Sequence, residues 1–115
     1  MLRELTGIRR IVIKTGKTDL RMGITGLASL VRLEYGMNAL EEGTIFLFCR
    51  NRRDRIKGLF YENGGWVLLY VRLSRGSVFQ WPRDEDDARE ITREQYLRLL
   101  DGFTLEGSIK MNRKQ

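Results

Sequence analysis

The chain has 115 residues, and its 21 lysines and arginines against 15 acids give a formal net charge of +6. This length suits one domain with a single hydrophobic core, and no apolar run approaches the roughly 18 residues of a membrane span. Histidine is absent and cysteine occurs once, which excludes histidine-based catalytic dyads, the usual zinc sites and an internal disulfide. The ten N-terminal residues lack the apolar core of a signal peptide, so we expect a cytoplasmic protein.

The first predicted elements are a strand within residues 7–16 and a helix that follows it. Three β-branched residues, Ile11 to Ile13, lie between glycines, which is typical of a short buried strand. The helix is expected to begin where Thr18 or Asp19 can accept hydrogen bonds from its first backbone N–H groups, and to end at Gly36. Its apolar residues share one helical face: Leu20, Ile24, Leu27, Val31 and Tyr35.

Three strand-like runs come next, at residues 44–49, 55–61 and 65–73. The last two are joined by Glu-Asn-Gly-Gly, whose Asn-Gly pair strongly indicates a β-hairpin. A fifth strand is predicted at residues 77–81, and it ends at Pro82 because proline cannot donate to a strand ladder. Since short loops join these consecutive strands, we expect a mostly antiparallel meander.

The C-terminal part combines an acidic segment with a second helix. Residues 83–90 contain five acids and two bases, and we interpret them as a solvated linker that could also attract a basic partner. Thr92 and Gln95 have the spacing of a capping box, which indicates that the helix begins there. We expect the tail at 104–115 to be flexible. The residues that this helix is expected to bury are Tyr96, Leu99, Leu100 and Phe103.

Together these elements predict an α+β fold in a single domain over residues 1–115, with one helix after the first strand and one near the C-terminus. The predicted strand at 65–73 is apolar on both faces, so the position of the helices decides what Trp66 and Tyr70 do. If both helices pack on one face, these two residues form an open aromatic surface for bases or for a protein. If the helices pack on opposite faces, Trp66 and Tyr70 belong to the core.

The strongest functional signal is a basic cluster at residues 50–57, in which five bases accompany a single acid, Asp54. The planar guanidinium of arginine binds phosphate at two points, so the cluster favours contact with a DNA backbone. A solvated turn is the alternative interpretation. Further bases surround the expected start of the first helix, where a phosphate can also bind. The candidate DNA-binding residues are Arg50, Arg52, Arg53, Arg55, Lys57, Lys14, Lys17 and Arg21.

The sequence offers no pattern that indicates catalysis. Gly-Lys-Thr at 16–18 suggests a phosphate-binding loop, but the full motif requires a glycine at position 11, which is isoleucine. Metal-dependent nucleases need separated carboxylates that converge on two metal ions. The candidates here are Asp19, Asp54, which is surrounded by bases, Glu62, which lies in a turn, and the local cluster at 84–87, and they do not resemble a spaced triad. We therefore expect a protein that is not an enzyme and that needs no metal or other cofactor.

Three blocks of the sequence resemble a family of small bacterial proteins. They are TGKTDLRMGITGL at 15–27, the stretch from IFLFC to FQWP at 45–82, and ITREQYLRLLDG at 91–102. These blocks are similar to the TnpB accessory proteins of IS-sixty-six-type bacterial insertion sequences, and the resemblance covers residues 7–103. The chain departs from the family pattern at Tyr61, Glu62 and Val71.

The resemblance implies an accessory role in the transposition of a mobile element, whose larger transposase carries the catalytic carboxylates. We expect a non-catalytic protein that binds DNA through the basic cluster, with the ends of the element as one candidate target. The alternative is an adaptor that docks the transposase, or a second copy of this chain, without contacting DNA. The candidate residues of that protein interface are Trp66, Tyr70, Asp84, Glu85, Asp86 and Asp87.

Overall fold

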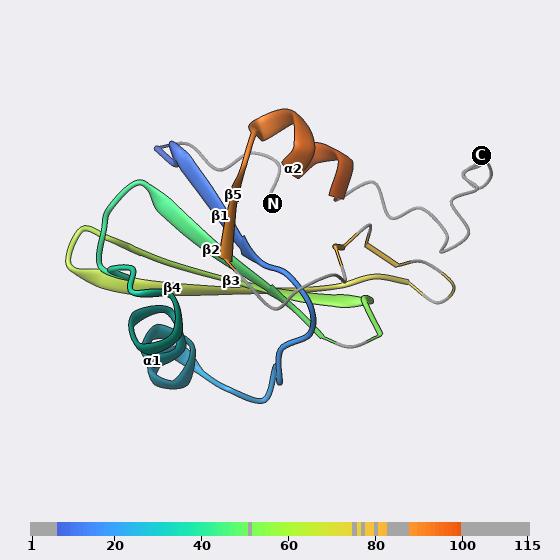
Figure 1. Cartoon of the computed structure of the whole chain (residues 1–115), viewed down its shortest axis with the longest axis horizontal. Helices are drawn as coiled ribbons and strands as arrows, with labels where there is room; N and C mark the ends of the chain where they lie inside the picture. The colour runs from blue at the N-terminus through green and yellow to red at the C-terminus, as the bar shows by residue number, and fades with distance from the viewer. Residues whose placement is uncertain are drawn as a thin grey trace.

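A computed structural model describes residues 7–50, 52–74, 76, 78–79, 81–82 and 88–99. These residues form two helices and a five-stranded sheet with the order β4-β3-β2-β1-β5 (Figure 1). The predicted α+β fold with a mostly antiparallel sheet is therefore confirmed. The elements are β1 (Arg10–Lys14), α1 (Ile24–Tyr35), β2 (Thr44–Cys49), β3 (Arg55–Glu62), β4 (Gly65–Arg72), β5 (Ala88–Ile91) and α2 (Arg93–Leu99).

The sheet contains one parallel pair, β1 and β2, in which Val12 lies opposite Phe46. Parallel neighbours need a crossover connection, and α1 supplies it. The antiparallel meander is therefore limited to β2, β3 and β4. The hairpin between β3 and β4 is confirmed, because Asn63 and Gly64 both have positive φ angles, 53° and 76°, as a type I′ turn requires.

Helix α1 starts later than the sequence predicts. Its N-cap is Gly23, which offers no side-chain hydrogen bond. Asp19 does not cap the helix, because its Oδ1 accepts a 3.0 Å hydrogen bond from the backbone N–H of Arg21 instead. The competing local turn thus keeps residues 17–22 out of the helix. The predicted end at Gly36 is confirmed: this residue is left-handed, with φ of 64°, and its N–H donates to the carbonyl of Val31.

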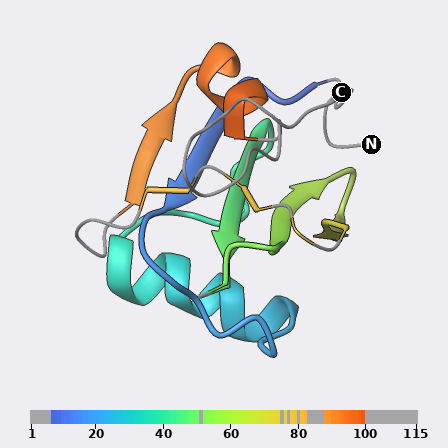
Figure 2. The same ribbon diagram turned by 90° about the vertical axis from the view of Figure 1, so that its right-hand side faces the viewer.

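The two helices lie on opposite sides of the sheet, as Figures 1 and 2 both show. On one side, Leu27 and Val31 of α1 pack with residues of β1, β2 and β3, which are Val12, Phe46, Phe48 and Leu59. On the other side, Tyr96 and Leu99 of α2 join the inward residues of the same strands, which are Ile11, Ile13, Ile45, Leu47, Cys49, Ile56 and Phe60. The lone Cys49 is thus a buried core residue.

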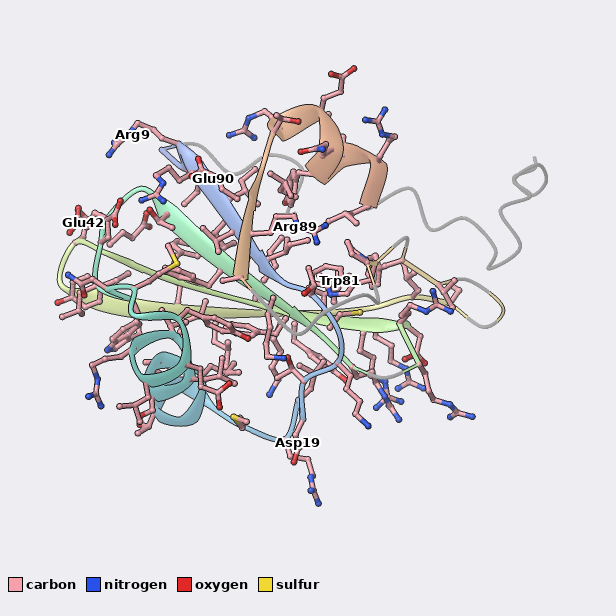
Figure 3. The ribbon with its side chains drawn as sticks, in the orientation of Figure 1. Arg9, Asp19, Glu42, Trp81, Arg89 and Glu90 are labelled. Carbon is pink, nitrogen blue, oxygen red and sulfur yellow. The ribbon has the colours of Figure 1, made fainter. Side chains whose placement is uncertain are left out.

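The fifth strand does not form where the sequence predicts it. The described residues of the 77–81 segment are not in a strand. Phe79 and Trp81 are instead buried on the α2 side of the sheet, where Figure 3 shows Trp81. The indole Nε1 of Trp81 donates a 2.9 Å hydrogen bond to the carbonyl of Lys14. β5 arises from the end of the expected acidic linker and pairs antiparallel with β1. Residues 83–87 of that linker lie outside the described residues.

Helix α2 begins as the sequence predicts. The backbone N–H of Gln95 donates to Thr92 Oγ1 at 3.0 Å, and the N–H of Thr92 donates to Gln95 Oε1 at 2.8 Å. This reciprocal pair is the predicted capping box. Leu100, Phe103 and the tail at 104–115 lie outside the described residues. Neither described helix has the length and apolar character needed to cross a membrane.

Candidate nucleic-acid interface

Helix α1 packs on one face of the sheet, and the helix and the loop before it leave part of that face uncovered. Side chains alternate along a strand, so every second residue of β3 and β4 points to the α1 side. At one end of this side, Leu59, Trp66 and Leu68 pack against the helix cluster. Further along the same face, the alternation places Arg55 and Lys57 on β3 and Tyr70 and Arg72 on β4.

This uncovered part forms the floor of a cleft of about 1000 Å³, which we call the basic cleft. One wall is the loop between β1 and α1. Arg50 also lines the cleft. It follows the end of β2 at the same spacing of two as Phe46 and Phe48, so it lies on the same side of the sheet as they do. Five bases face one acid, so the lining has a formal charge of +4. The lining residues are Lys17, Thr18, Asp19, Leu20, Arg21, Arg50, Arg55, Lys57, Leu68 and Tyr70.

Two arginines lie directly opposite each other on this face. Arg55 of β3 pairs in register with Arg72 of β4. Like charges at directly opposed positions destabilise a sheet, so a bound anion would relieve their repulsion. Sequence reasoning missed Arg72, since it lies outside the basic cluster. The signal that finds it is the register of the Asn-Gly hairpin, which sets Arg55 against Arg72.

Lys57 connects the floor of the cleft to its wall. Its Nζ donates a 2.9 Å hydrogen bond to the carbonyl of Met22 and lies 5.9 Å from the ring centroid of Tyr70. The Tyr70 side chain is 53% exposed. Trp66 is half-buried, and its ring meets Tyr61 edge-on with a centroid distance of 5.0 Å. The two aromatic residues therefore differ: Trp66 belongs to the edge of the core, whereas Tyr70 faces the cleft.

The wall of the cleft carries an exposed ion pair between Asp19 and Arg21. The Arg21 guanidinium donates to both carboxylate oxygens, from Nε at 3.0 Å and from NH2 at 2.9 Å. These hydrogen bonds lower the pKa of Asp19 to about 2. The loop is fixed to the sheet by the backbone N–H of Thr18, which donates to the carbonyl of Cys49 at 2.8 Å. Figure 3 shows Asp19 projecting from the loop, away from the sheet.

The turn between β2 and β3 divides the basic cluster. The backbone N–H of Arg50 donates to the carbonyl of Arg55 at 3.2 Å, and Arg53 has a positive φ of 61°. Arg50, Arg55 and Lys57 line the cleft, but Arg52 and Arg53 do not. Arg52 is exposed on the turn, where it extends the positive surface beyond the cleft.

The remaining candidate bases have different positions. Lys17 and Arg21 line the cleft, but Lys14 is only 5% exposed, and its Nζ donates to the carbonyl of Lys17 at 3.0 Å. This corrects the expectation that Lys14 contacts a phosphate: it supports the loop from inside. Asp84, Glu85, Asp86 and Asp87 lie outside the described residues. Among the residues that the structure describes, no group of three histidines, cysteines or acids could hold a metal ion.

Comparison with known proteins shows the family to which this chain belongs. The sequence model described as IS66 Orf2-like protein matches residues 9–110. The chain belongs to the IS66 Orf2-like family. This confirms the resemblance to the accessory proteins of these insertion sequences, and the family indicates an accessory role in transposition.

Two curated relatives come from Sinorhizobium fredii (strain NBRC 101917 / NGR234). The uncharacterized protein y4hO is 36% identical over 94 residues, which cover 82% of this chain and 80% of the relative. The uncharacterized protein y4jC is 31% identical over 97 residues, which cover 82% of this chain and 79% of the relative. No solved structure matches this IS66 Orf2-like chain.

Proposed function

We propose that this IS66 Orf2-like protein assists transposition as a non-catalytic DNA-binding factor, and that the basic cleft makes the contact. The observation that carries the proposal is the convergence of bases from three segments. Lys17 and Arg21 come from the loop before α1, Arg50 follows β2, and Arg55 and Lys57 belong to β3, yet all line one cleft. Such a concentration of positive charge on a concave surface attracts polyanions.

The chemistry of these side chains matches a phosphate backbone rather than base edges. Guanidinium groups bind phosphate oxygens at two points, and lysine adds a compact positive charge. Phosphate contacts position a protein on DNA but carry no direct sequence information. We therefore expect similar affinity for different sequences, so recognition of the element ends would come from DNA shape or from the transposase.

Fluorescence anisotropy with two duplexes tests the proposal. One duplex has the sequence of an element end and the other an unrelated sequence, and both are titrated at several salt concentrations. Each neutralised phosphate contributes about −0.9 to the slope of log affinity against log salt, so three to five contacts give a slope of roughly −3 to −5. Absence of binding at low salt would contradict the proposal.

A matched pair of double variants assigns binding to the cleft. Lys17→Gln with Arg21→Gln removes two exposed cleft charges, and the salt slope should become shallower by about 2. Arg32→Gln with Arg98→Gln removes two exposed charges from α1 and α2, neither of which lines the cleft, and the slope should stay unchanged. If both double variants made the salt slope shallower by the same amount, the binding would reflect the overall charge of the protein and not a localised site.

If neither duplex binds, the adaptor hypothesis gains support, with the transposase as the partner. The place to test it is a smaller cleft of about 280 Å³ beside α1, whose lining includes Met37, Leu40 and Trp66. Leu40 is half-exposed, so Leu40→Gln should leave the fold intact. Loss of co-purification with the transposase in this variant would assign the protein contact to that surface.

A further inference from the structure

The basic cleft contains an exposed aromatic ring, which a purely electrostatic contact does not require. Among the described residues, the large apolar or aromatic side chains that are exposed are those of Leu33, Leu40, Tyr70 and Leu97, and Tyr70 is the aromatic one. It lies on the floor of the cleft between Lys57 and Arg72 rather than on an outer surface. Within a continuous duplex, neighbouring base pairs cover the faces of the bases, so a ring within a concave surface is suited to stack on an unpaired base.

Two polar atoms of residues that line the cleft indicate that a phosphate could bind next to that base. Thr18 Oγ1 and Arg55 Nε are buried and have no hydrogen-bond partner among the described residues. The Thr18 side chain is 6% exposed and lines the cleft together with Arg55. Arginine can only donate and a hydroxyl can donate, so a ligand that suits both atoms offers acceptor oxygens. A third such atom, Asp54 Oδ1, lies 3.8 Å from Arg50 Nε, and Asp54 does not line the cleft.

The volume of the cleft is consistent with one nucleotide. Pockets for small organic ligands span roughly 300 to 1000 Å³, and this cleft lies at the upper end of that range. It is walled by the loop that Thr18 fixes to β2 and is bordered by the turn after Arg50. A rod-shaped duplex would meet mainly the rim, which is where the exposed charges of Lys17 and Arg21 lie.

We propose that the basic cleft holds an unpaired nucleotide of a DNA strand, with its base stacked on Tyr70 and its phosphate bound by Thr18 and Arg55. This inference rests on the proposed DNA-binding function and names its preferred form of DNA. The protein then favours single strands, and duplexes with unpaired ends, over continuous duplex. Such DNA is present where strands have been separated or cut.

Anisotropy with three related probes tests this preference at fixed salt. The probes are a blunt duplex, the same duplex with a short single-stranded extension, and the isolated strand. Stacking of one base on an aromatic side chain contributes about 1–3 kcal/mol, so the strand and the extended duplex should bind about tenfold or more tightly than the blunt duplex. Thymidine monophosphate serves as a competitor that represents a free nucleotide.

Variants then assign the preference to named side chains. Tyr70→Ala should remove the preference by weakening strand binding about tenfold while blunt-duplex binding stays the same, and Tyr70→Phe should retain it. Leu33→Ala, which removes an exposed large side chain outside the cleft, is the matched control and should change nothing. Thr18→Val should weaken strand binding without lowering the melting temperature, since its hydroxyl makes no described hydrogen bond.

The outcomes separate this inference from the proposed function. Equal affinity for strand and blunt duplex, unaffected by Tyr70→Ala, would overturn the unpaired-nucleotide site and leave phosphate binding in place. Competition by thymidine monophosphate at concentrations similar to those of the strand would overturn it in favour of a free-nucleotide site. Failure of all three probes to bind would overturn both proposals together.

Discussion

The side chains of the cleft wall show how one acid can control a basic site. Asp19 engages Arg21 through both carboxylate oxygens, so this guanidinium, whose side chain is 91% exposed, is already paired in the free protein. A phosphate must compete with this carboxylate for the same donors. The pair therefore sets the availability of Arg21 to a polyanion, and the removal of Asp19 should increase it.

Asp19→Asn should raise the affinity for DNA a few-fold at low salt. The amide keeps the size of the side chain but removes one negative charge from the cleft and weakens its hold on Arg21. The gain should fade as salt increases, because exposed charges are screened. Glu62→Gln, which changes an exposed acid at the far end of β3, is the control and should have little effect. Reduced affinity of Asp19→Asn would show that the carboxylate positions Arg21 for DNA.

The binding of DNA should not depend on pH between about pH 5 and pH 7. Histidine, the usual group that titrates in this range, is absent from the chain. The hydrogen bonds from Arg21 lower the pKa of Asp19 to about 2, so its ion pair is fully formed throughout this range and is lost only as the pH falls towards 2. Anisotropy at constant ionic strength checks this, and a transition near pH 6 would contradict it.

The sequence predicts that a basic surface exists better than it predicts which residues line the cleft. The density of bases at 50–57 predicts one basic surface, but the turn between β2 and β3 divides the cluster, and only Arg50, Arg55 and Lys57 of its five bases line the cleft. Burial depends on distant partners, so the sequence does not reveal that Lys14 supports the loop from within. Thr18 was one of two expected caps of the helix, beside Asp19, and its proposed role depends on a hydroxyl whose lack of a described partner is visible only in three dimensions.

The strands and helices were predictable wherever their signals are local. The Asn-Gly turn, the Thr92–Gln95 capping box and the end of α1 at Gly36 each depend on a few neighbouring residues. β5 depends instead on pairing with β1 across the chain, and two of its four residues are charged. The apolar character of Phe79 and Trp81 suggested a strand, but it reflects burial in the core on the α2 side of the sheet.

The tight packing of β3 on the α2 side provides a test of the core. A Cβ atom added at Gly58 would lie 3.1 Å from side-chain carbons of both Ile45 and Leu47. Gly58→Ala should therefore lower the free energy of unfolding by about 1–3 kcal/mol, as overpacking in a well-packed core does. Chemical denaturation monitored by tryptophan fluorescence measures this change.

Gly26→Ala is the control for this packing prediction. At Gly26, an added Cβ would lie 3.2 Å from the Cβ of Met22, which belongs to the loop before α1 and needs to shift by only a few tenths of an ångström, and alanine favours a helix over glycine by about 1 kcal/mol. This variant should be neutral or more stable than the natural protein. If Gly26→Ala lowered the free energy of unfolding as much as Gly58→Ala does, the two sites would be equally confined.

The arrangement of the whole sheet determines where the cleft can be. One helix on each face builds two cores, and α1 is too short to cover all of its side. The sequence left this arrangement open, because both faces of β4 are apolar and the pattern does not decide whether the helices share one face or pack on opposite faces. It also did not reveal the parallel pairing of β1 and β2, which requires knowing that the first helix crosses over the sheet.

DNA that binds the folded protein should stabilise it against heat. A ligand at one hundred times its dissociation constant raises the free energy of unfolding by about 2.7 kcal/mol if it does not bind the unfolded chain. The melting temperature should therefore rise with the concentration of single-stranded DNA. The Lys17→Gln, Arg21→Gln double variant should show a smaller rise, and an identical rise would place the DNA contact elsewhere on the protein.

The cross-strand pairing of Arg55 with Arg72 affects how this protein can evolve. Repulsion between the two guanidinium groups weakens the pairing of β3 with β4 in the free protein. Replacing either arginine with threonine would favour the sheet and disfavour an anion. Laboratory selection for heat resistance alone should therefore discard these arginines early, whereas selection for mobility of the element should retain both.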